Sequence, residues 1–181
     1  SSWAPYGLKQ LPFTQHTEYR MYAMPHIWFR VLRSLQAFLR GTQVLAVFTG
    51  AHGVGKRSLL QQWLRYGRVK MPLIHIMPTQ QMQPLQFIEI LAENCDLSLQ
   101  VDKSVSVAFK GLMQRLSKKG KCHVLMLDCI ERLPLASVAV LAEILRLQPD
   151  DAAFFKIIVT LDKERSGSVL QLFDDVLASS S

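Results

Sequence analysis

The stretch "TGAHGVGKRSLL" at residues 49–60 has the spacing Gly-x-x-x-x-Gly-Lys of a phosphate-binding loop, the Walker A motif. An apolar run at residues 43–50 precedes it and a helical pattern at residues 57–66 follows, which is the setting typical of such loops. Glycines let the backbone turn its N–H groups around an anion, and the positive end of the following helix adds to that attraction. The stretch therefore predicts a P-loop domain that binds ATP or ADP. The residues expected to contact the nucleotide are Gly50, His52, Gly53, Val54, Gly55, Lys56, Arg57 and Ser58.

Arg57 departs from the P-loop pattern at a position that matters chemically. In P-loop proteins the residue after the lysine is a serine or threonine whose hydroxyl binds Mg²⁺. Arginine has no acceptor atom and cannot do so, and Ser58 comes one residue later, about 100° further round a helix. Mg²⁺ binding is therefore in doubt. The sequence leaves open whether Arg57 pairs with phosphate charge or points to solvent.

A second acidic element occurs in "HVLMLDCIERL" at residues 123–133. Asp128 follows an apolar run, as does the aspartate that holds Mg²⁺ through water in P-loop ATPases. A glutamate that polarises the attacking water usually comes next in such ATPases, but Cys129 stands there. Glu131 follows two residues later, either as a replacement base or as the salt-bridge partner of a neighbouring lysine or arginine. Asp128 and Glu131 are thus the catalytic candidates, with Asp128 as an indirect metal ligand, and hydrolysis is expected to be impaired.

The rest of the chain alternates between strand and helix patterns. Apolar runs predict strands at residues 43–50, 71–78, 122–128 and 154–162. Helical spacing predicts helices at residues 26–40, 57–66, 84–94, 104–118, 136–147 and 168–173. This order predicts an α/β fold whose parallel sheet is covered on both faces. We divide it into an N-terminal segment with its leading helix at residues 1–40 and a P-loop core at residues 41–181.

Net charge and the length of apolar segments indicate which kinds of partner the chain could have. The formal net charge of +7 suggests nucleic acid or an anionic membrane as a partner. The main basic concentration, "KGLMQRLSKKGK" at residues 110–121, keeps its apolar residues on one helical face, which is typical of a solvated surface helix. No apolar segment reaches the roughly 18 residues needed to span a bilayer. We therefore expect a soluble excised domain, with any membrane anchor in a segment absent from this chain.

The chain resembles the ExeA/GspA-like AAA+ P-loop ATPases, bacterial proteins tied to type II secretion and pilus biogenesis. The resembling segments are "YGLKQLPF" (residues 6–13), "VFTGAHGVGKRSLL" (47–60), "VLMLDCIERL" (124–133) and "LAEILRLQ" (141–148). The resemblance implies an AAA+ three-layer sandwich around a central parallel sheet, with the helical lid largely missing here. It also implies that Leu161 replaces the polar sensing residue of the fourth strand, Thr160 being the nearest polar side chain.

Departures at the metal, water and sensor positions indicate a pseudo-ATPase that binds ATP or ADP weakly or not at all. The family resemblance implies a cytoplasmic interaction or assembly module of a bacterial envelope machine, of secretion or pilus type. Its partners would be proteins of that complex, at the cytoplasmic face of the inner membrane in the full-length protein, and the chain itself would be a monomer or weak dimer. Two alternatives stay open: an active ATPase that energises such assembly, and a DNA-binding AAA+ module.

Overall fold

The computed structural model describes residues 8–10, 16–20, 25–50, 70–99, 104–162 and 167–178. Its strands are β1 (Leu8–Gln10), β2 (His16–Arg20), β3 (Leu45–Gly50), β4 (Leu73–Ile76), β5 (His123–Leu127) and β6 (Phe155–Asp162). Its helices are α1 (Pro25–Arg40), α3 (Pro84–Asn94), α4 (Val105–Lys119), the short 3-10 helix η2 (Ile130–Arg132), α5 (Leu135–Leu147) and α6 (Gly167–Ala178). The elements predicted within these ranges are confirmed, while the helix predicted at residues 57–66 lies outside them.

The described strands form one sheet in the order β1-β2-β3-β6-β5-β4. β1 is antiparallel to β2, and every other neighbouring pair is parallel. The carboxyl ends of β3, β6, β5 and β4 therefore meet at one edge of the sheet, which is where open α/β sheets bind their ligands. The N-terminal segment is part of this architecture, because β2 pairs with β3 along its whole length.

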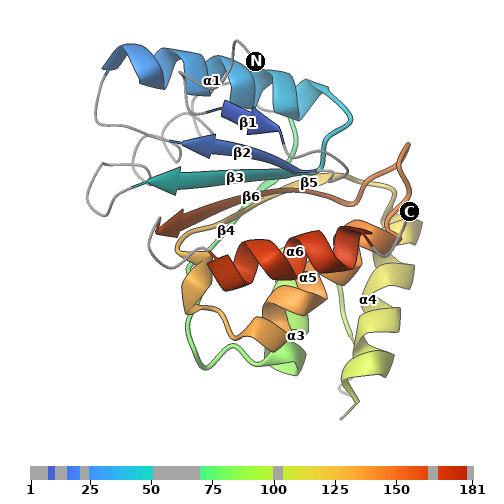
Figure 1. The fold of residues 1–181 in the computed structure, drawn as a ribbon. Coiled ribbons are helices and arrows are strands. Elements are labelled where there is room, and N and C mark those ends of the chain that lie inside the picture. The colour runs from blue at the N-terminus through green and yellow to red at the C-terminus, as the bar shows by residue number, and fades with distance from the viewer. Residues whose placement is uncertain are drawn as a thin grey trace.

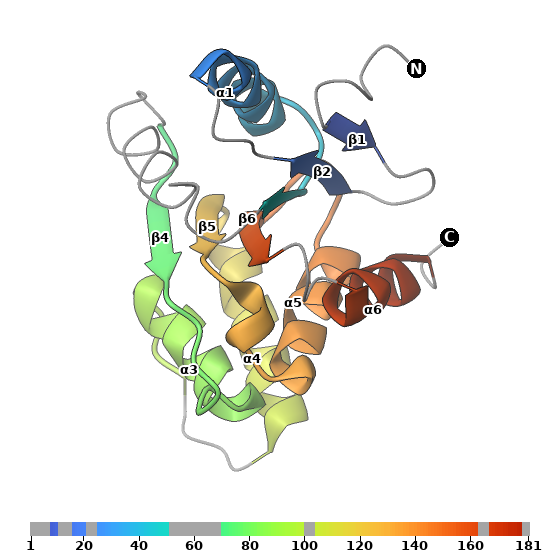
Figure 2. The same ribbon diagram turned by 60° about the vertical axis from the view of Figure 1, so that its left-hand side comes forward.

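Helices cover the sheet on both sides, so the fold has three layers (Figure 1). α1 lies over one face, where Leu35 and Phe38 pack against Phe48, Met126 and other strand residues. Among the described elements, α3, α4, α5 and α6 lie on the opposite face, over a larger apolar cluster to which all four contribute residues (Figures 1 and 2). The α/β three-layer prediction is confirmed.

Local sequence signals mark where the helices begin and end. α3 begins at Pro84, a residue suited to the first helical position because the missing N–H has no helical partner there. α4 ends at Lys119 and is capped by Gly120, which adopts the left-handed conformation (φ 61°) and donates its N–H to the Leu116 carbonyl. Lys118 and Lys119 occupy the last turn of α4, where positive charge is favourable to the helix dipole.

A buried lysine ties α1 to the centre of the sheet. Lys156 of β6 is 8% exposed, and its Nζ donates hydrogen bonds to the carbonyls of Phe38, Gly41 and Gln43 at 2.7, 2.7 and 2.9 Å. The same Nζ lies 4.9 Å from the centroid of the Phe38 ring. Burial lowers the pKa of Lys156, while the carbonyls at the end of α1 favour its charged form. We call this arrangement the Lys156 clamp.

Candidate functional site

Asp128 lies at the carboxyl end of β5 and is almost fully buried, with 1% of its surface exposed. The preceding alternate residues, Val124 and Met126, belong to the apolar cluster beneath α1. Strand alternation therefore directs Asp128 toward the α1 face of the sheet. Its position after an apolar strand is as the sequence predicts.

His75 of β4 reaches Asp128 from the edge strand of the sheet. Its Nε2 lies 2.7 Å from Asp128 Oδ2, and 26% of the His75 side chain is exposed. An ionised carboxylate can only accept hydrogen bonds, so His75 Nε2 carries the proton and donates it. The sequence analysis did not identify His75. The available signal was a polar residue inside the otherwise apolar strand "LIHI".

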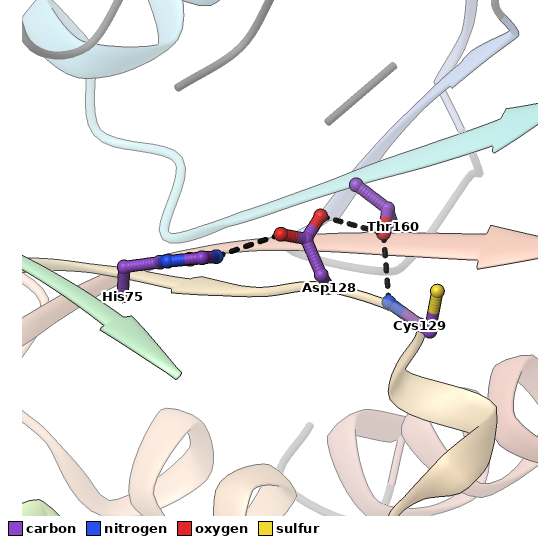
Figure 3. A network of polar contacts seen from close by, with 4 residues as sticks. All are labelled: His75, Asp128, Cys129 and Thr160. Atoms are coloured by element: carbon purple, nitrogen blue, oxygen red, sulfur yellow. Dashed lines mark hydrogen bonds and ion pairs between the residues drawn. The ribbon is translucent and has the colours of Figure 1, made fainter. Parts of the chain in front are cut away.

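Thr160 of β6 approaches Asp128 from the other side. Its hydroxyl oxygen accepts the Cys129 N–H at 2.8 Å, and Thr160 Oγ1 lies 3.2 Å from Asp128 Oδ1. The backbone N–H can only donate, so the hydroxyl proton of Thr160 is left to bond Asp128. His75, Asp128, Thr160 and the Cys129 N–H thus form one chain of contacts across β4, β5 and β6, which we call the strand-end network (Figure 3).

The structure corrects the prediction for β6, the fourth of the strands predicted from the sequence. The resemblance places Leu161 at the polar sensing position, but Leu161 is 1% exposed and packs in the apolar cluster on the face opposite α1. Thr160 points to Asp128 instead. The strand therefore has a polar residue that faces Asp128.

Cys129 turns the chain out of the sheet. Its backbone is left-handed, with φ 53° and ψ 58°, a conformation uncommon for residues other than glycine and asparagine. This turn leads into η2 and aims the Cys129 N–H at Thr160. The position after Asp128 therefore presents a half-buried thiol and no carboxylate.

Glu131, the second catalytic candidate, lies in η2. One of its carboxylate oxygens, Oε2, is buried and has no hydrogen-bond partner among the described residues. The ion pairs found within the described residues are His75 with Asp128 and Arg146 with Glu143, so the salt bridge expected of Glu131 is not among them.

The loop itself is represented only by its first glycine. Gly50 ends β3 and pairs in register with Asp162, the last residue of β6. This register brings a second carboxylate to the edge where Asp128 lies, which the sequence analysis did not anticipate. The other predicted contact residues, His52, Gly53, Val54, Gly55, Lys56, Arg57 and Ser58, lie outside the described residues. Within the described part, no group of three or more His, Cys, Asp or Glu side chains is arranged to hold a metal ion.

The described residues form a three-layer α/β domain with a mostly parallel sheet and a buried aspartate at the end of β5. The chain is similar in structure to Cdc6p from Pyrobaculum aerophilum, with TM-score 0.66 and 17% identity over 88% of this chain and 45% of that one. It is also similar to the Aeropyrum pernix Orc1 protein, solved in complex with DNA, with TM-score 0.57 and 21% identity over 84% of this chain and 41% of that one.

The TM-scores show a shared fold, and the chain spans less than half the length of either neighbour. No family model matches the chain, and no curated protein matches it in sequence. Among the described helices, none has the length and apolar character required to cross a membrane.

Proposed function

We propose that the chain is a degenerate AAA+ ATPase-like domain that serves as an interaction or assembly module, with weak or no ATP hydrolysis. The observation that carries this proposal is that Cys129, a thiol at a left-handed turn, directly follows the buried Asp128. A positioned general base typically contributes roughly 10²–10⁴-fold to a reaction rate. The next carboxylate along the chain, Glu131, has one oxygen buried in η2 and is poorly presented to a water.

The nucleotide part of the proposal rests on the loop sequence. Gly50, Gly53 and Gly55 supply a backbone anion nest, and Lys56 supplies charge for the phosphates of ATP or ADP. Arg57 stands where the metal-binding hydroxyl belongs. We therefore propose weak nucleotide binding that depends little on Mg²⁺.

For the partner, the resemblance to the ExeA/GspA-like family supports proteins of a bacterial envelope machine of secretion or pilus type. In this proposal the domain works on the cytoplasmic side, with any membrane attachment supplied by a segment outside this chain. It is a monomer or weak dimer whose mass in solution does not respond to ATP. Light scattering that showed an ATP-driven hexamer would contradict this.

DNA is the second candidate partner. The similar Orc1 protein was solved with DNA, and this chain carries a formal net charge of +7. Non-specific binding to duplex DNA would be steeply salt-dependent, because each neutralised phosphate releases counterions. A fluorescence anisotropy titration of arbitrary duplex DNA at several salt concentrations separates this candidate from a purely protein-binding module.

Steady-state phosphate release tests the main proposal. We expect turnover far below the usual enzyme scale of about 1 s⁻¹, and no further loss on Lys56→Ala. Arg57→Thr or Cys129→Glu alone should recover little, because residues that act as one catalytic unit are strongly non-additive. Turnover by the unmodified protein at or above that scale, abolished by Lys56→Ala, would overturn the proposal and favour the active ATPase.

A further inference from the structure

Asp128 is the residue to which the fold class would assign a magnesium ion, held through water. In the structure each oxygen of this buried carboxylate already accepts a hydrogen bond from a protein donor. His75 Nε2 lies 2.7 Å from Oδ2, and Thr160 Oγ1 lies 3.2 Å from Oδ1. The two donors come from strands on either side of β5, so the carboxylate is held from both directions (Figure 3).

These residues do not fit a magnesium ion. Mg²⁺ keeps most of its water shell and reaches such an aspartate through waters that donate to the carboxylate. His75 and Thr160 supply donors of the same kind from the protein itself, at a carboxylate that is only 1% exposed. The direct ligand that P-loop proteins use, a hydroxyl after the lysine, is Arg57 in this chain.

We propose that Asp128 is the anchor of a protein-only network that holds together the carboxyl ends of β4, β5 and β6, with His75 in the place of the hydrated metal. His75 is the positioning residue of this network. It acts through Asp128, whose other oxygen is joined through Thr160 to the Cys129 N–H. The contact also secures β4, an edge strand with β5 as its one neighbour in the described sheet.

The network accounts for two features that a metal site leaves unexplained. A histidine inside an apolar strand is costly unless its ring nitrogen has a partner, and Asp128 is that partner. The left-handed Cys129 costs backbone energy, and its N–H is paired by the same Thr160 hydroxyl that bonds Asp128. This inference rests on the proposed function, because it assigns the loss of metal chemistry to a particular side chain.

Thermal unfolding of matched variants tests the network without any nucleotide. His75→Phe keeps a ring of similar size and removes the donor, and the loss of a hydrogen bond to a charged group should lower Tm by about 3–12 °C. His75→Gln places an amide N–H near the position of Nε2 and should retain more than half of the lost stability. The control is His123→Phe, the same substitution at a histidine of the neighbouring strand β5. His123 is more buried than His75, and its Nδ1 has no hydrogen-bond partner among the described residues. That control should not lower Tm.

The second part of the test measures the effect of Mg²⁺ on the Tm of the unmodified protein. With a Kd of about 1 mM, binding of Mg²⁺ at about 10 mM would raise Tm by about 3–6 °C. We expect no such rise at matched ionic strength, and no change in the His75 ring nitrogen shifts by NMR. A Mg²⁺-dependent rise in Tm that Asp128→Asn abolishes would overturn the inference, as would a His75→Phe variant as stable as the unmodified protein.

The two proposals can fail separately. ATP turnover at or above about 1 s⁻¹, with no Mg²⁺ response at His75, would overturn the proposed function and leave the network standing. A Mg²⁺-dependent rise in Tm that Asp128→Asn abolishes, in a protein without ATP turnover, would overturn the network and leave the proposed function standing.

Discussion

The Lys156 clamp offers the sharpest test of how the sheet and α1 are joined. The perturbation is Lys156→Met, which keeps an unbranched side chain of similar length and removes the ammonium group. Three carbonyls, those of Phe38, Gly41 and Gln43, then lose their donor, and the Phe38 ring loses its cation.

The expected magnitude follows from two opposing terms. Each hydrogen bond from a charged donor contributes about 1.5–3 kcal/mol. Against this, burial of the ammonium carries a desolvation cost, seen in the lowered pKa of Lys156. Gly41 is exposed and Gln43 is partly exposed, so water can replace part of what their carbonyls lose. We expect the free energy of unfolding to fall by about 2–4 kcal/mol, which corresponds to a fall in Tm of about 4–16 °C.

Urea unfolding followed by circular dichroism measures the change directly. Lys121→Met is the control, because Lys121 is exposed just before β5 and a substitution there should change stability by no more than about 0.5 kcal/mol. If Lys156→Met lay within that same margin of the unmodified protein, the clamp would be energetically neutral and the reasoning would be wrong.

Three further predictions concern single side chains. Thr160→Val should lower the free energy of unfolding by about 1–3 kcal/mol, because the Cys129 N–H loses its acceptor. Thr160→Ser keeps the hydroxyl and should keep most of the stability, so equal urea midpoints for the two variants would contradict this. Burial lowers the pKa of His123 from its ordinary 6.5, helped by the charges of nearby lysines, so the unfolded chain binds the proton more readily and stability is lost as pH falls below about 6.5. Urea midpoints at several pH values should therefore fall less steeply for His123→Phe than for the unmodified protein, and parallel pH profiles would argue against it. Burial raises the pKa of the Cys95 thiol to about 11, so mass-spectrometric mapping should find maleimide on Cys95 only after unfolding, and rapid labelling of the native protein would refute its burial.

The core of the fold could be predicted because its signals are local. The strands β3, β5 and β6 are nearly continuous apolar runs, as expected of parallel strands buried on both faces. β2, with the sequence "HTEYR", contains no aliphatic residue, so no hydrophobic pattern marks it. Its strand character comes from pairing with β3, which is information that only the three-dimensional structure supplies.

The candidate site could be predicted only in part, for the same reason. Asp128 was identified because an acidic residue directly after a buried strand is a local pattern. His75 lies 53 residues before Asp128 in the chain, and the two meet because β4 and β5 are neighbours in the sheet. Thr160 and Leu161 differ by one residue, which in a strand decides the face on which the side chain lies. Sequence spacing alone did not resolve that choice.

Different residues hold the fold together and form the strand-end network. The layers are held by the apolar clusters on both faces of the sheet and by the Lys156 clamp, and Asp128, His75 and Thr160 belong to neither cluster. In the proposed function, Arg57 and Cys129 stand in the places of a metal ligand and a base. Cys129 belongs to neither apolar cluster. A buried carboxylate without a metal or another partner would destabilise the fold, because burying an unpaired charge costs free energy. His75 and Thr160 satisfy Asp128 from within the protein, so the same aspartate that would serve catalysis in an ATPase contributes here to holding three strand ends in place.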